Sequence, residues 1–385
     1  MKVLVLWRGP SPYRVDFFNE LGKLCDLTVL FERTPKQIPD KERSWFHENF
    51  DHFKGIYLKS WNIGKDVMSF QQFKYLWNSK NYDYIIIGMY STWIQTLSIL
   101  FMKFFRIPYI LNSDGGFIKQ ESKLVYQIKH FLISGASAYL ASSNGTAEYL
   151  QYYGASKKIT IYPFTTSFKK DVCKINSLDE KTYFRKKIEA KEKIIVLFSG
   201  QFIYRKGLDI LLKAANKIDK DCGIYIVGGK PTSEYLAIVS QNKLTNIHFV
   251  DFKTPKELAD YYKAADIYVL PTREDIWGLV INEAMSYGLP VITTNKCLAG
   301  VELIENGKNG YIIPEENSTE LAKYINILVK DRDLRELMRD NNKRKIQDYT
   351  IENMAKCHAD FLMICTIYDR NSYYCIYSRK FISAL

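Results

Sequence analysis

The chain has 385 residues, of which 47% are apolar, and its formal net charge is +12. This length exceeds what one hydrophobic core usually serves, so two domains are expected, and the apolar content excludes a wholly disordered chain. No long uncharged apolar run occurs and the opening apolar stretch is short, so neither a membrane span nor a signal peptide is predicted. The seven cysteines are scattered without CxxC or CxxH spacing, which favours a reducing cytoplasm and predicts no zinc site.

The positive charge is concentrated in the first part of the chain. Residues 1–165 carry 20 Lys and Arg against 13 Asp and Glu, and they contain five of the six tryptophans. Basic residues beside aromatic residues are typical of proteins that contact anionic membranes or nucleic acid. A soluble protein with a lysine-rich surface has the same charge, and on charge alone this interpretation is favoured.

Apolar strands alternate with amphipathic helices through residues 1–165, which predicts a doubly wound parallel sheet. The segment at residues 33–70 breaks this alternation. It is charged, aromatic and weakly periodic, and it is predicted to be an exposed segment. The strands are expected at residues 2–6, 27–31, 84–88, 109–111, 138–141 and 159–162.

A polar turn follows the strand at residues 109–111. In parallel sheets, ligands bind beyond the carboxyl ends of the strands. Asp114, in the turn Asn112-Ser-Asp-Gly-Gly116, is therefore a candidate to hydrogen-bond a ligand, and the alternative is an ordinary turn aspartate. The loop at residues 9–14 also follows a strand, but it lacks a GxGxxG pattern, so no dinucleotide site is predicted there.

The composition shifts to Lys, Asp, Thr and Ser after residue 163, which predicts a linker with a short helix at residues 166–190. A second alternating series begins with a strand at residues 194–198. It predicts a second domain over residues 191–350, with helices continuing to about residue 363. Residues 366–385 match no recognised pattern and are left unassigned.

The most informative stretch lies at residues 271–290, between strands at residues 267–270 and 291–294. Asp275 in its loop and Glu283 on its helix are separated by seven residues. A glycine where this helix begins lets backbone N–H groups approach a ligand, and the helix dipole favours an anion. The alternative is that Asp275 caps the helix and Glu283 is a solvated surface residue, and on spacing alone this alternative is slightly favoured.

The stretch PTREDIWGLVINEAMSYGLPVITT, residues 271–294, resembles the acidic-x7-acidic signature of the retaining, nucleotide-sugar-dependent glycosyltransferase family numbered four, in glycosyl transferases group 1. The resemblance extends through the turn at residues 307–310, and weaker matches reach about residue 362. It implies the α/β GT-B fold, in which two Rossmann-like doubly wound domains face across a cleft and a helix at residues 351–365 crosses back to the first domain. The first acidic position is usually Glu in this family, and here it is Asp275.

A second match lies beyond the strand at residues 194–198. The family pattern there is Gly-Arg followed five residues later by Lys-Gly. In this chain Gln201 occupies the arginine position, Lys206 and Gly207 match, and Arg205 lies beside them. Two cations at a strand end suit a pyrophosphate, because they stabilise the charge that develops on the leaving diphosphate. Without the resemblance, a solvated Arg–Lys pair would be the default interpretation.

The resemblance implies transfer of a sugar, with retention, from a UDP- or GDP-linked donor in the second domain to a glycan or lipid-linked acceptor in the first. Such a reaction belongs to the synthesis of surface polysaccharide or glycolipid, in the cytoplasm or at the inner face of the membrane, and no nucleic-acid partner is expected. The implied catalytic residues are Asp114, Asp275 and Glu283. The implied donor-binding residues are Gln201, Arg205, Lys206, Gly228, Trp277, Gly278, Leu279, Val280 and Glu283.

Neither a metal ion nor another cofactor is predicted. The segments at residues 219–221 and 331–333 have Asp-x-Asp spacing, but both fall at helix boundaries. Lys206, Arg205 and the helix that begins at Gly278 are expected to supply the positive charge that a metal would otherwise provide.

Two other functions remain open. A sugar-nucleotide epimerase of similar shape would isomerise a donor without any acceptor. A non-catalytic partner subunit would bind the nucleotide sugar without turnover, because Asp275 and Gln201 depart from the family pattern.

Overall fold

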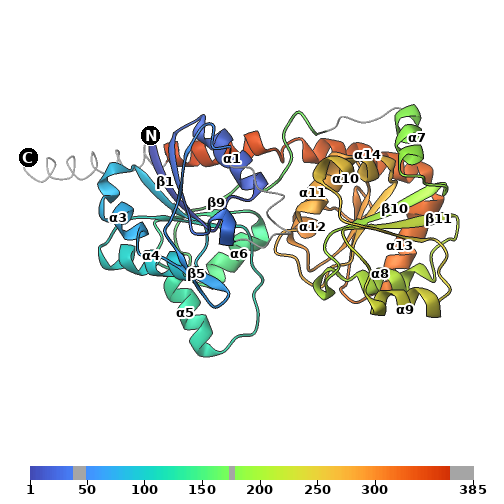
Figure 1. Cartoon of the computed structure of the whole chain (residues 1–385), viewed down its shortest axis with the longest axis horizontal. Coiled ribbons are helices and arrows are strands. Elements are labelled where there is room, and N and C mark those ends of the chain that lie inside the picture. Colours follow the sequence, from blue (N-terminus) through green and yellow to red (C-terminus); the bar gives the residue numbers. More distant parts are fainter. Residues whose placement is uncertain (38–48, 173–177, 365–385) are drawn as a thin grey trace, which may run out of the picture. The chain divides into compact units, whose positions relative to one another are not determined.

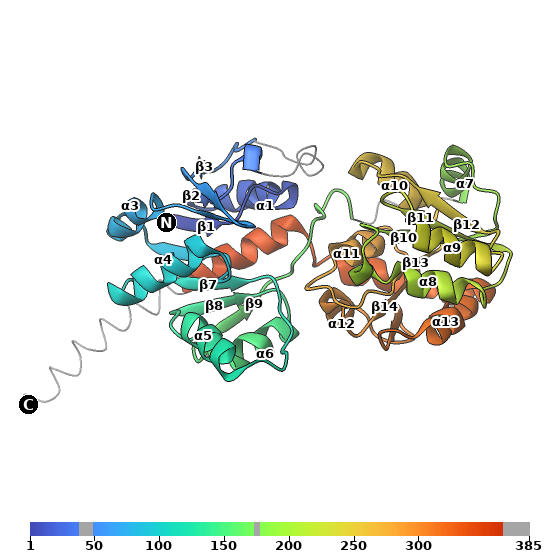
Figure 2. The same cartoon turned by 60° about the horizontal axis from the view of Figure 1, so that its bottom comes forward.

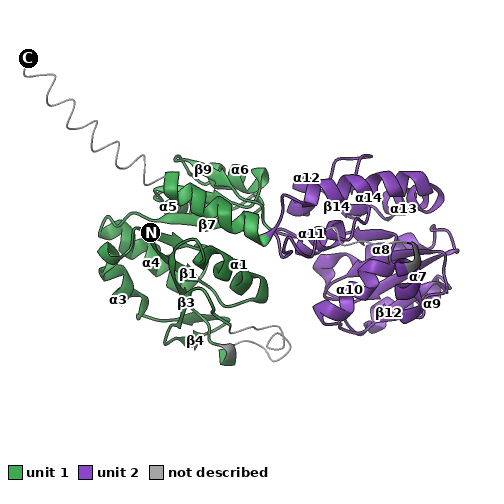
Figure 3. Cartoon of the chain, turned by 90° about the horizontal axis from the view of Figure 1, so that it is seen from above, with its two compact units in different colours: residues 1–164, 351–385 green, residues 165–350 purple. Residues whose placement is uncertain are grey.

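A computed structural model of the chain describes residues 1–37, 49–172 and 178–364 (Figure 1). The unassigned tail at residues 366–385 lies outside the described residues. The chain divides into two compact units (Figure 3). Unit 1 comprises residues 1–164 together with the chain from residue 351, and unit 2 comprises residues 165–350.

Unit 1 is built on a seven-stranded sheet in the order β3-β2-β1-β6-β7-β8-β9, and all its neighbouring strands are parallel. Its central strands are almost entirely buried because helices cover both faces (Figure 2). The strands are β1 (Lys2–Trp7), β2 (Asp26–Phe31), β3 (Lys54–Tyr57), β6 (Tyr84–Ile87), β7 (Ile110–Ser113), β8 (Ala138–Ala141) and β9 (Ile159–Ile161).

The helices of unit 1 connect these strands in chain order. They are α1 (Pro12–Gly22), α3 (Gln72–Trp77), α4 (Trp93–Phe104), α5 (Lys123–Ile133) and α6 (Asn144–Tyr152), with short 3-10 turns η1 (Pro35–Gln37) and η2 (Ser79–Asn81). A helix at residues 351–364 also packs in this unit. Its His358 ring lies 4.8 Å from the ring of Phe17 on α1 and 4.5 Å from that of Tyr162, centroid to centroid.

The segment at residues 33–70, predicted to be exposed, contains three short strands in its second half. Strand β3 extends the sheet at its edge, and β4 (Trp61–Ile63) and β5 (Asp66–Met68) form a separate antiparallel hairpin. These strands have three or four residues each, which is too short for alternation to be recognised in the sequence. Residues 38–48 of this segment lie outside the described residues.

Unit 2 is built on a six-stranded parallel sheet in the order β12-β11-β10-β13-β14-β15. Helices again lie on both faces (Figures 2 and 3). The strands are β10 (Ile194–Ser199), β11 (Cys222–Val227), β12 (Ile247–Val250), β13 (Ile267–Leu270), β14 (Val291–Thr294) and β15 (Gly310–Ile313).

The helices of unit 2 are α7 (Leu178–Lys187), α8 (Leu208–Ala215), α9 (Ser233–Gln241), α10 (Pro255–Ala264), α11 (Leu279–Ser286), α12 (Leu298–Leu303), α13 (Ser318–Lys330) and α14 (Arg332–Ile346). Helix α7 falls in the segment predicted to be a linker. It is attached to the unit through Lys181 and Arg185, which both pair with the buried Asp266 at 2.5 Å. No helix in the described part of the chain has the length and apolar character needed to cross a bilayer.

Strand order fixes where each sheet can hold a ligand. In unit 2 the chain runs outward from β10 through β11 to β12, and then restarts at β13 on the other side of β10. In unit 1 the same reversal falls between β1 and β6. Loops diverge at such a switch point and leave room for a ligand beyond the carboxyl ends of the two strands. The ends of β10 and β13 therefore define the first place to look for a site.

Candidate functional site

The loops that follow β10, β11 and β13 approach one another so closely that glycine is required at two positions. Gly207 has φ +70°, and a Cβ built on it would lie 1.9 Å from the carbonyl oxygen of Pro271. Gly228 has φ +144°, and its Cβ would lie 2.0 Å from the carbonyl oxygen of Gly200. Side chains strongly disfavour both the backbone conformation and the contact. The glycines thus bring three strand-end loops together at the switch point.

Lys206 and Asp275, predicted from two different motifs, are brought into contact here. Lys206 follows β10 in the 3-10 turn η3 (Tyr204–Lys206), and its Nζ lies 2.5 Å from Oδ2 of Asp275. The guanidinium of Arg205 lies 3.4 Å from the other carboxylate oxygen. The Asp275 side chain is only 12% exposed. Asp275 therefore holds both cations, and the interpretation of Asp275 as a helix cap is wrong, because Gly278 occupies the N-cap of α11.

Arg273 fixes the loop that carries the two cations. Its guanidinium makes two 2.8 Å hydrogen bonds to Asp209, and it lies 3.7 Å from the ring centroid of Tyr204. Its backbone N–H donates to the carbonyl oxygen of Arg205 at 2.8 Å. These contacts tie the β13 loop to η3, so the loop is preorganised. Arg273 was not predicted to be a site residue, although it lies within the acidic motif, because nothing in its spacing distinguishes it from a surface arginine.

Helix α11 begins at the edge of the same group. Gly278 has φ +94°, and a Cβ there would meet the Cys297 sulfur at 2.6 Å. The backbone N–H groups of Leu279 and Val280 lie in the first turn, where a helix has no acceptors of its own, and both residues are partly exposed. Trp277, also predicted to bind the donor, has a buried side chain. Its indole is 3% exposed and donates to Oδ1 of Asn282 at 2.8 Å.

Glu283 lies one turn into α11, and it is not a solvated surface residue. The Tyr262 hydroxyl donates to its carboxylate at 3.0 Å, and Tyr262 lies 2.8 Å from the hydroxyl of Ser199 at the end of β10. Burial raises the pKa of Glu283 to about 7, although hydrogen bonds from Tyr262 and Thr166 and the charge of Lys206 act in the opposite direction. Its protonation is therefore poised near neutral pH.

The two remaining donor-binding predictions fall at neighbouring strand ends. Gln201 is exposed immediately after β10, and Gly228 follows β11. Both lie on the loops that the glycine contacts bring together. All the residues predicted to bind the donor therefore lie at the carboxyl edge of the unit 2 sheet, around β10, β11 and β13.

Asp114, the candidate in unit 1, is held by a buried arginine. Arg14 on α1 is completely buried and forms an ion pair with Asp114. The Tyr162 hydroxyl donates to the same carboxylate at 2.7 Å. The Arg14 guanidinium carbon lies 4.3 Å from the ring centroid of Trp7 and 4.6 Å from that of Phe164. The interpretation of Asp114 as an ordinary turn aspartate is therefore wrong, and one quarter of its side chain remains accessible.

The helix at residues 351–364 reaches this network through His358. Its Nε2 lies 3.2 Å from Oδ1 of Asn112, and the Asn112 amide nitrogen lies 3.1 Å from the Tyr162 hydroxyl. Burial lowers the pKa of His358 to about 4, and the charge of Arg14 acts in the same direction. His358 is therefore neutral at physiological pH. Neither Arg14 nor His358 was predicted, because their roles depend on contacts between elements far apart in the sequence.

The two Asp-x-Asp segments serve the backbone. Asp331 accepts a 2.8 Å hydrogen bond from the N–H of Leu334 as the N-cap of α14. Asp219 accepts a 3.1 Å hydrogen bond from the N–H of Asp221. Across the described ranges, no group of three or more His, Cys, Asp and Glu could hold a metal ion.

The part of the chain that holds the candidate site in unit 2 is similar to known proteins. Residues 179–345, which include every predicted donor-binding residue, match the family model described as glycosyl transferases group 1. The match confirms the predicted resemblance to this group.

Curated relatives and solved structures extend the likeness. The chain is 28% identical to an uncharacterized glycosyltransferase of Methanocaldococcus jannaschii, over 65% of this chain and 68% of that protein. It is 25% identical to the capsular polysaccharide biosynthesis glycosyltransferase CapM of Staphylococcus aureus, over 50% and 51%. The chain spans 50% of the length of an uncharacterized glycosyltransferase of Haemophilus influenzae and 44% of the length of spore coat protein SA of Bacillus subtilis.

The structure of Anabaena HepE in complex with UDP matches 94% of this chain and 100% of that chain, with a TM-score of 0.76 and 18% identity. At this identity the likeness shows the fold alone. It confirms the predicted GT-B fold, with two Rossmann-like domains.

Proposed function

We propose that this protein is a retaining glycosyltransferase that moves a sugar from a nucleotide-diphosphate sugar to a glycan or lipid-linked acceptor in surface polysaccharide or glycolipid synthesis. The observation that carries the proposal is the meeting of Lys206, Arg205, Asp275 and Glu283 at one strand edge, within the residues that match the glycosyl transferases group 1 model. HepE, of the same fold, was solved with UDP and with UDP-glucose. The name of CapM supports a role in polysaccharide synthesis.

The two cations and the start of α11 are suited to the leaving diphosphate. When the bond between the anomeric carbon and the diphosphate oxygen breaks, negative charge develops on that oxygen. Lys206, Arg205 and the first N–H groups of α11 stabilise this charge more strongly in the transition state than in the ground state, which is the requirement for faster transfer. Asp275 keeps both cations oriented before the donor arrives, so little reorganisation is needed when it binds.

In this proposal Glu283 binds the ribose. In its ionised form the carboxylate accepts hydrogen bonds from two hydroxyl groups, while the Tyr262 hydroxyl holds its orientation. In unit 1, Asp114 is positioned by Arg14 and Tyr162 to accept a hydrogen bond from the sugar or the acceptor.

Retention follows when the acceptor hydroxyl attacks the anomeric carbon from the face that the diphosphate leaves. The new bond joins the acceptor oxygen to that carbon, the bond to the diphosphate oxygen breaks, and the acceptor proton passes to the departing diphosphate. No protein base is needed in this scheme, and the protein contributes positioning and charge stabilisation.

The decisive experiment measures transfer and donor hydrolysis by the full chain with a panel of UDP- and GDP-linked sugars. Lys206→Ala is expected to lower kcat/KM by about 100-fold or more, because it removes charge stabilisation at the leaving group. Lys308→Ala, which removes an exposed lysine of the same unit, is the matched control and should retain activity. Equal activities of the two variants would overturn the assignment of Lys206.

The same panel separates the other functions. An epimerase would isomerise the donor without acceptor, which NMR of the donor pool detects. A non-catalytic subunit would bind a donor and release no nucleoside diphosphate with any acceptor.

Metal-independent transfer is part of the proposal, since Lys206 and Arg205 supply positive charge where a divalent ion would otherwise act. Transfer rates are expected to be unchanged after dialysis against EDTA. Loss of activity that manganese restores would contradict this prediction.

A further inference from the structure

Unit 1 carries a group of exposed aromatic side chains that the proposed reaction does not use. We define the aromatic belt as Trp61, Phe70, Trp77, Phe104, Phe105 and Phe131, whose exposed fractions lie between 45% and 80%. They come from the β4–β5 hairpin region and from α3, α4 and α5. Single exposed apolar residues are common on soluble proteins, but a connected group of this kind marks an interaction surface.

The belt is continuous because its rings contact one another. Partly buried Phe73 and Phe101 bridge the exposed rings, and Lys103 Nζ lies 4.1 Å from the ring centroid of Phe131, which joins α4 to α5. Centroid distances are 5.6 Å for Trp61–Phe70, 6.2 Å for Phe70–Phe73, 4.9 Å for Phe73–Phe101, 4.5 Å for Phe101–Phe105, 5.2 Å for Trp77–Phe105 and 4.9 Å for Phe104–Phe105. Leu124 and Ile128 extend the apolar surface along α5, each more than half exposed.

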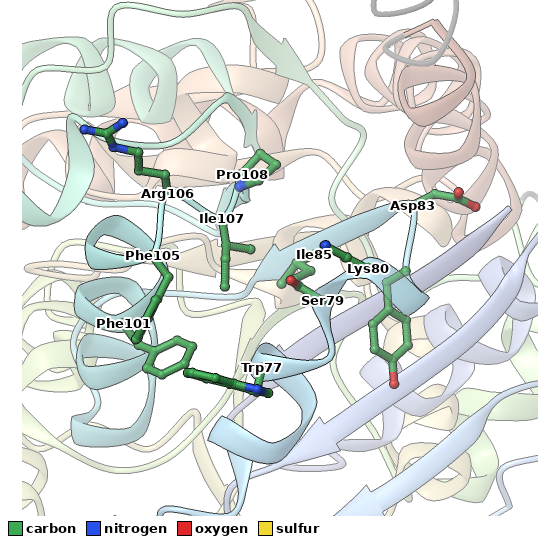
Figure 4. Close-up of a pocket in the computed structure, with 11 residues that line it drawn as sticks. Trp77, Ser79, Lys80, Asp83, Ile85, Phe101, Phe105, Arg106, Ile107 and Pro108 are labelled. Atoms are coloured by element: carbon green, nitrogen blue, oxygen red, sulfur yellow. The ribbon is translucent and has the colours of Figure 1, made fainter.

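A hollow of about 490 Å³ opens within the belt between α3 and the end of α4. Trp77, Phe101 and Phe105 line it together, and its charged lining residues are two cations, Lys80 and Arg106, and one acid, Asp83 (Figure 4). The hollow thus places positive charge beside aromatic surface, which suits a ligand with an anionic group attached to hydrocarbon.

The residues around the aromatic belt carry a net positive charge. Residues 72–133 carry seven Lys and Arg against three Asp and Glu. Glu121 pairs with Lys129, which is one of the seven, and Asp114 pairs with Arg14, so six cations remain against Asp83. An anionic partner therefore meets an uncompensated excess of positive charge.

We propose that the aromatic belt is a docking surface for a bilayer that contains anionic lipids. Exposed rings at the headgroup level and lysines and arginines on the lipid phosphates are the combination that holds proteins at membrane interfaces. Lys80 and Arg106 contact separate lipid phosphates at the rim of the hollow, and Phe104 and Phe131 enter the interface (Figure 4). The surface belongs to unit 1 alone and does not depend on the donor chemistry of unit 2, although it would bring a lipid-linked acceptor to the protein.

Vesicle flotation of the full chain tests the proposal. Vesicles of phosphatidylcholine with phosphatidylglycerol are expected to carry the protein, and phosphatidylcholine alone should carry much less. Lys80→Gln with Arg106→Gln should lower partitioning about 25-fold, since each cation near an anionic surface contributes about fivefold. Phe104→Ser with Phe131→Ser should lower it about tenfold or more. The control variant, Tyr183→Ser with Leu337→Ser, removes comparably exposed apolar residues of unit 2 and should leave the partitioning onto vesicles unchanged.

Three outcomes would overturn the proposal. The first is that the wild-type chain does not float with the vesicles, and the second is that all variants float equally. The third is a dimer in sedimentation that the Phe104 and Phe131 substitutions dissociate, because the belt would then be a contact between two copies of the chain. Circular dichroism and thermal unfolding confirm that each variant is folded. Nucleotide-sugar binding measured on the same samples keeps this result separate from the proposed transfer, because the belt substitutions leave unit 2 unchanged.

Discussion

Glu283 has two properties that oppose each other at neutral pH. The proposed binding of ribose hydroxyls through both oxygens requires the carboxylate, whereas burial favours the neutral acid and raises its pKa to about 7. An ordinary glutamate in the unfolded chain ionises near 4.5. The folded state therefore binds more protons between these values, and the contribution of Glu283 to stability is lost as the pH rises from 4.5 through 7. Ionisation of Glu283 thus lowers the stability of the folded state, whereas the proposed ribose binding needs the ionised form.

The pH dependence of donor binding tests this account. The affinity for the nucleotide sugar identified in the donor panel is expected to fall about tenfold from pH 8 to pH 6, because the ionised fraction of Glu283 falls by that factor. Glu283→Gln should bind more weakly at pH 8 and show a flat profile, measured by titration calorimetry. The same variant should be more stable than the wild type at pH 8, because no half-buried carboxylate then has to ionise. If the affinity of Glu283→Gln depends on pH in the same way as that of the wild type, Glu283 is not the titrating group.

At the scale of elements, the site depends on how closely the strand-end loops of unit 2 approach. Gly207 ends η3, which carries Lys206, and begins α8. Its missing side chain lets the backbone of the β10 loop touch the carbonyl oxygen of Pro271 at the end of β13. The ion pair of Lys206 with Asp275 spans the same two loops. A change in loop separation must therefore disturb both backbone packing and the charges of the site.

Comparison of two glycine substitutions isolates this effect. Gly207→Ala is expected to destabilise unit 2 by more than about 2 kcal/mol and to reduce transfer strongly, because it adds a backbone clash to the cost of a left-handed conformation. Gly307 also has a left-handed φ, +77°, but no atom lies within 4 Å of a Cβ built on it. Gly307→Ala should therefore cost only about 1 kcal/mol and leave transfer intact. If chemical denaturation shows the same loss of unfolding free energy for both variants, the close contact between the β10 and β13 loops does not contribute to stability.

At the scale of the whole molecule, regular alternation made most of the fold predictable. The expected strands at residues 27–31, 84–88 and 194–198 match β2, β6 and β10 to within a residue at each end, because a buried parallel strand is a continuous apolar run. The short strands β3, β4 and β5 had no such signal. The order of the strands, and hence the switch points, could be inferred only through the resemblance to a known fold.

The candidate site could also be predicted only in part. Lys206, Asp275 and Glu283 lie in local motifs, so their identities could be predicted, but the contact of Lys206 with Asp275 joins residues 69 positions apart. Arg14 and His358 are recognised only when α1, β7 and the helix at residues 351–364 are seen together. A buried arginine and a surface arginine are identical letters in a sequence, and burial is decided by packing between distant elements.

A donor that binds where the structure places these residues must leave a localised signature in hydrogen exchange. Ligand binding stabilises the native state by RT ln(1 + [L]/Kd), about 2.7 kcal/mol at 100-fold excess over Kd, and the protection concentrates where backbone opening releases the ligand. With UDP or GDP, we expect slower exchange in peptides covering residues 199–207 and 275–283 and no change in the sheet of unit 1. Lys206→Ala should abolish that protection at the same ligand concentration, because diphosphate binding then loses its main cation. Protection confined to unit 1 would mean that the nucleotide occupies the other switch point, between β1 and β6, and that the charged edge of unit 2 serves another ligand.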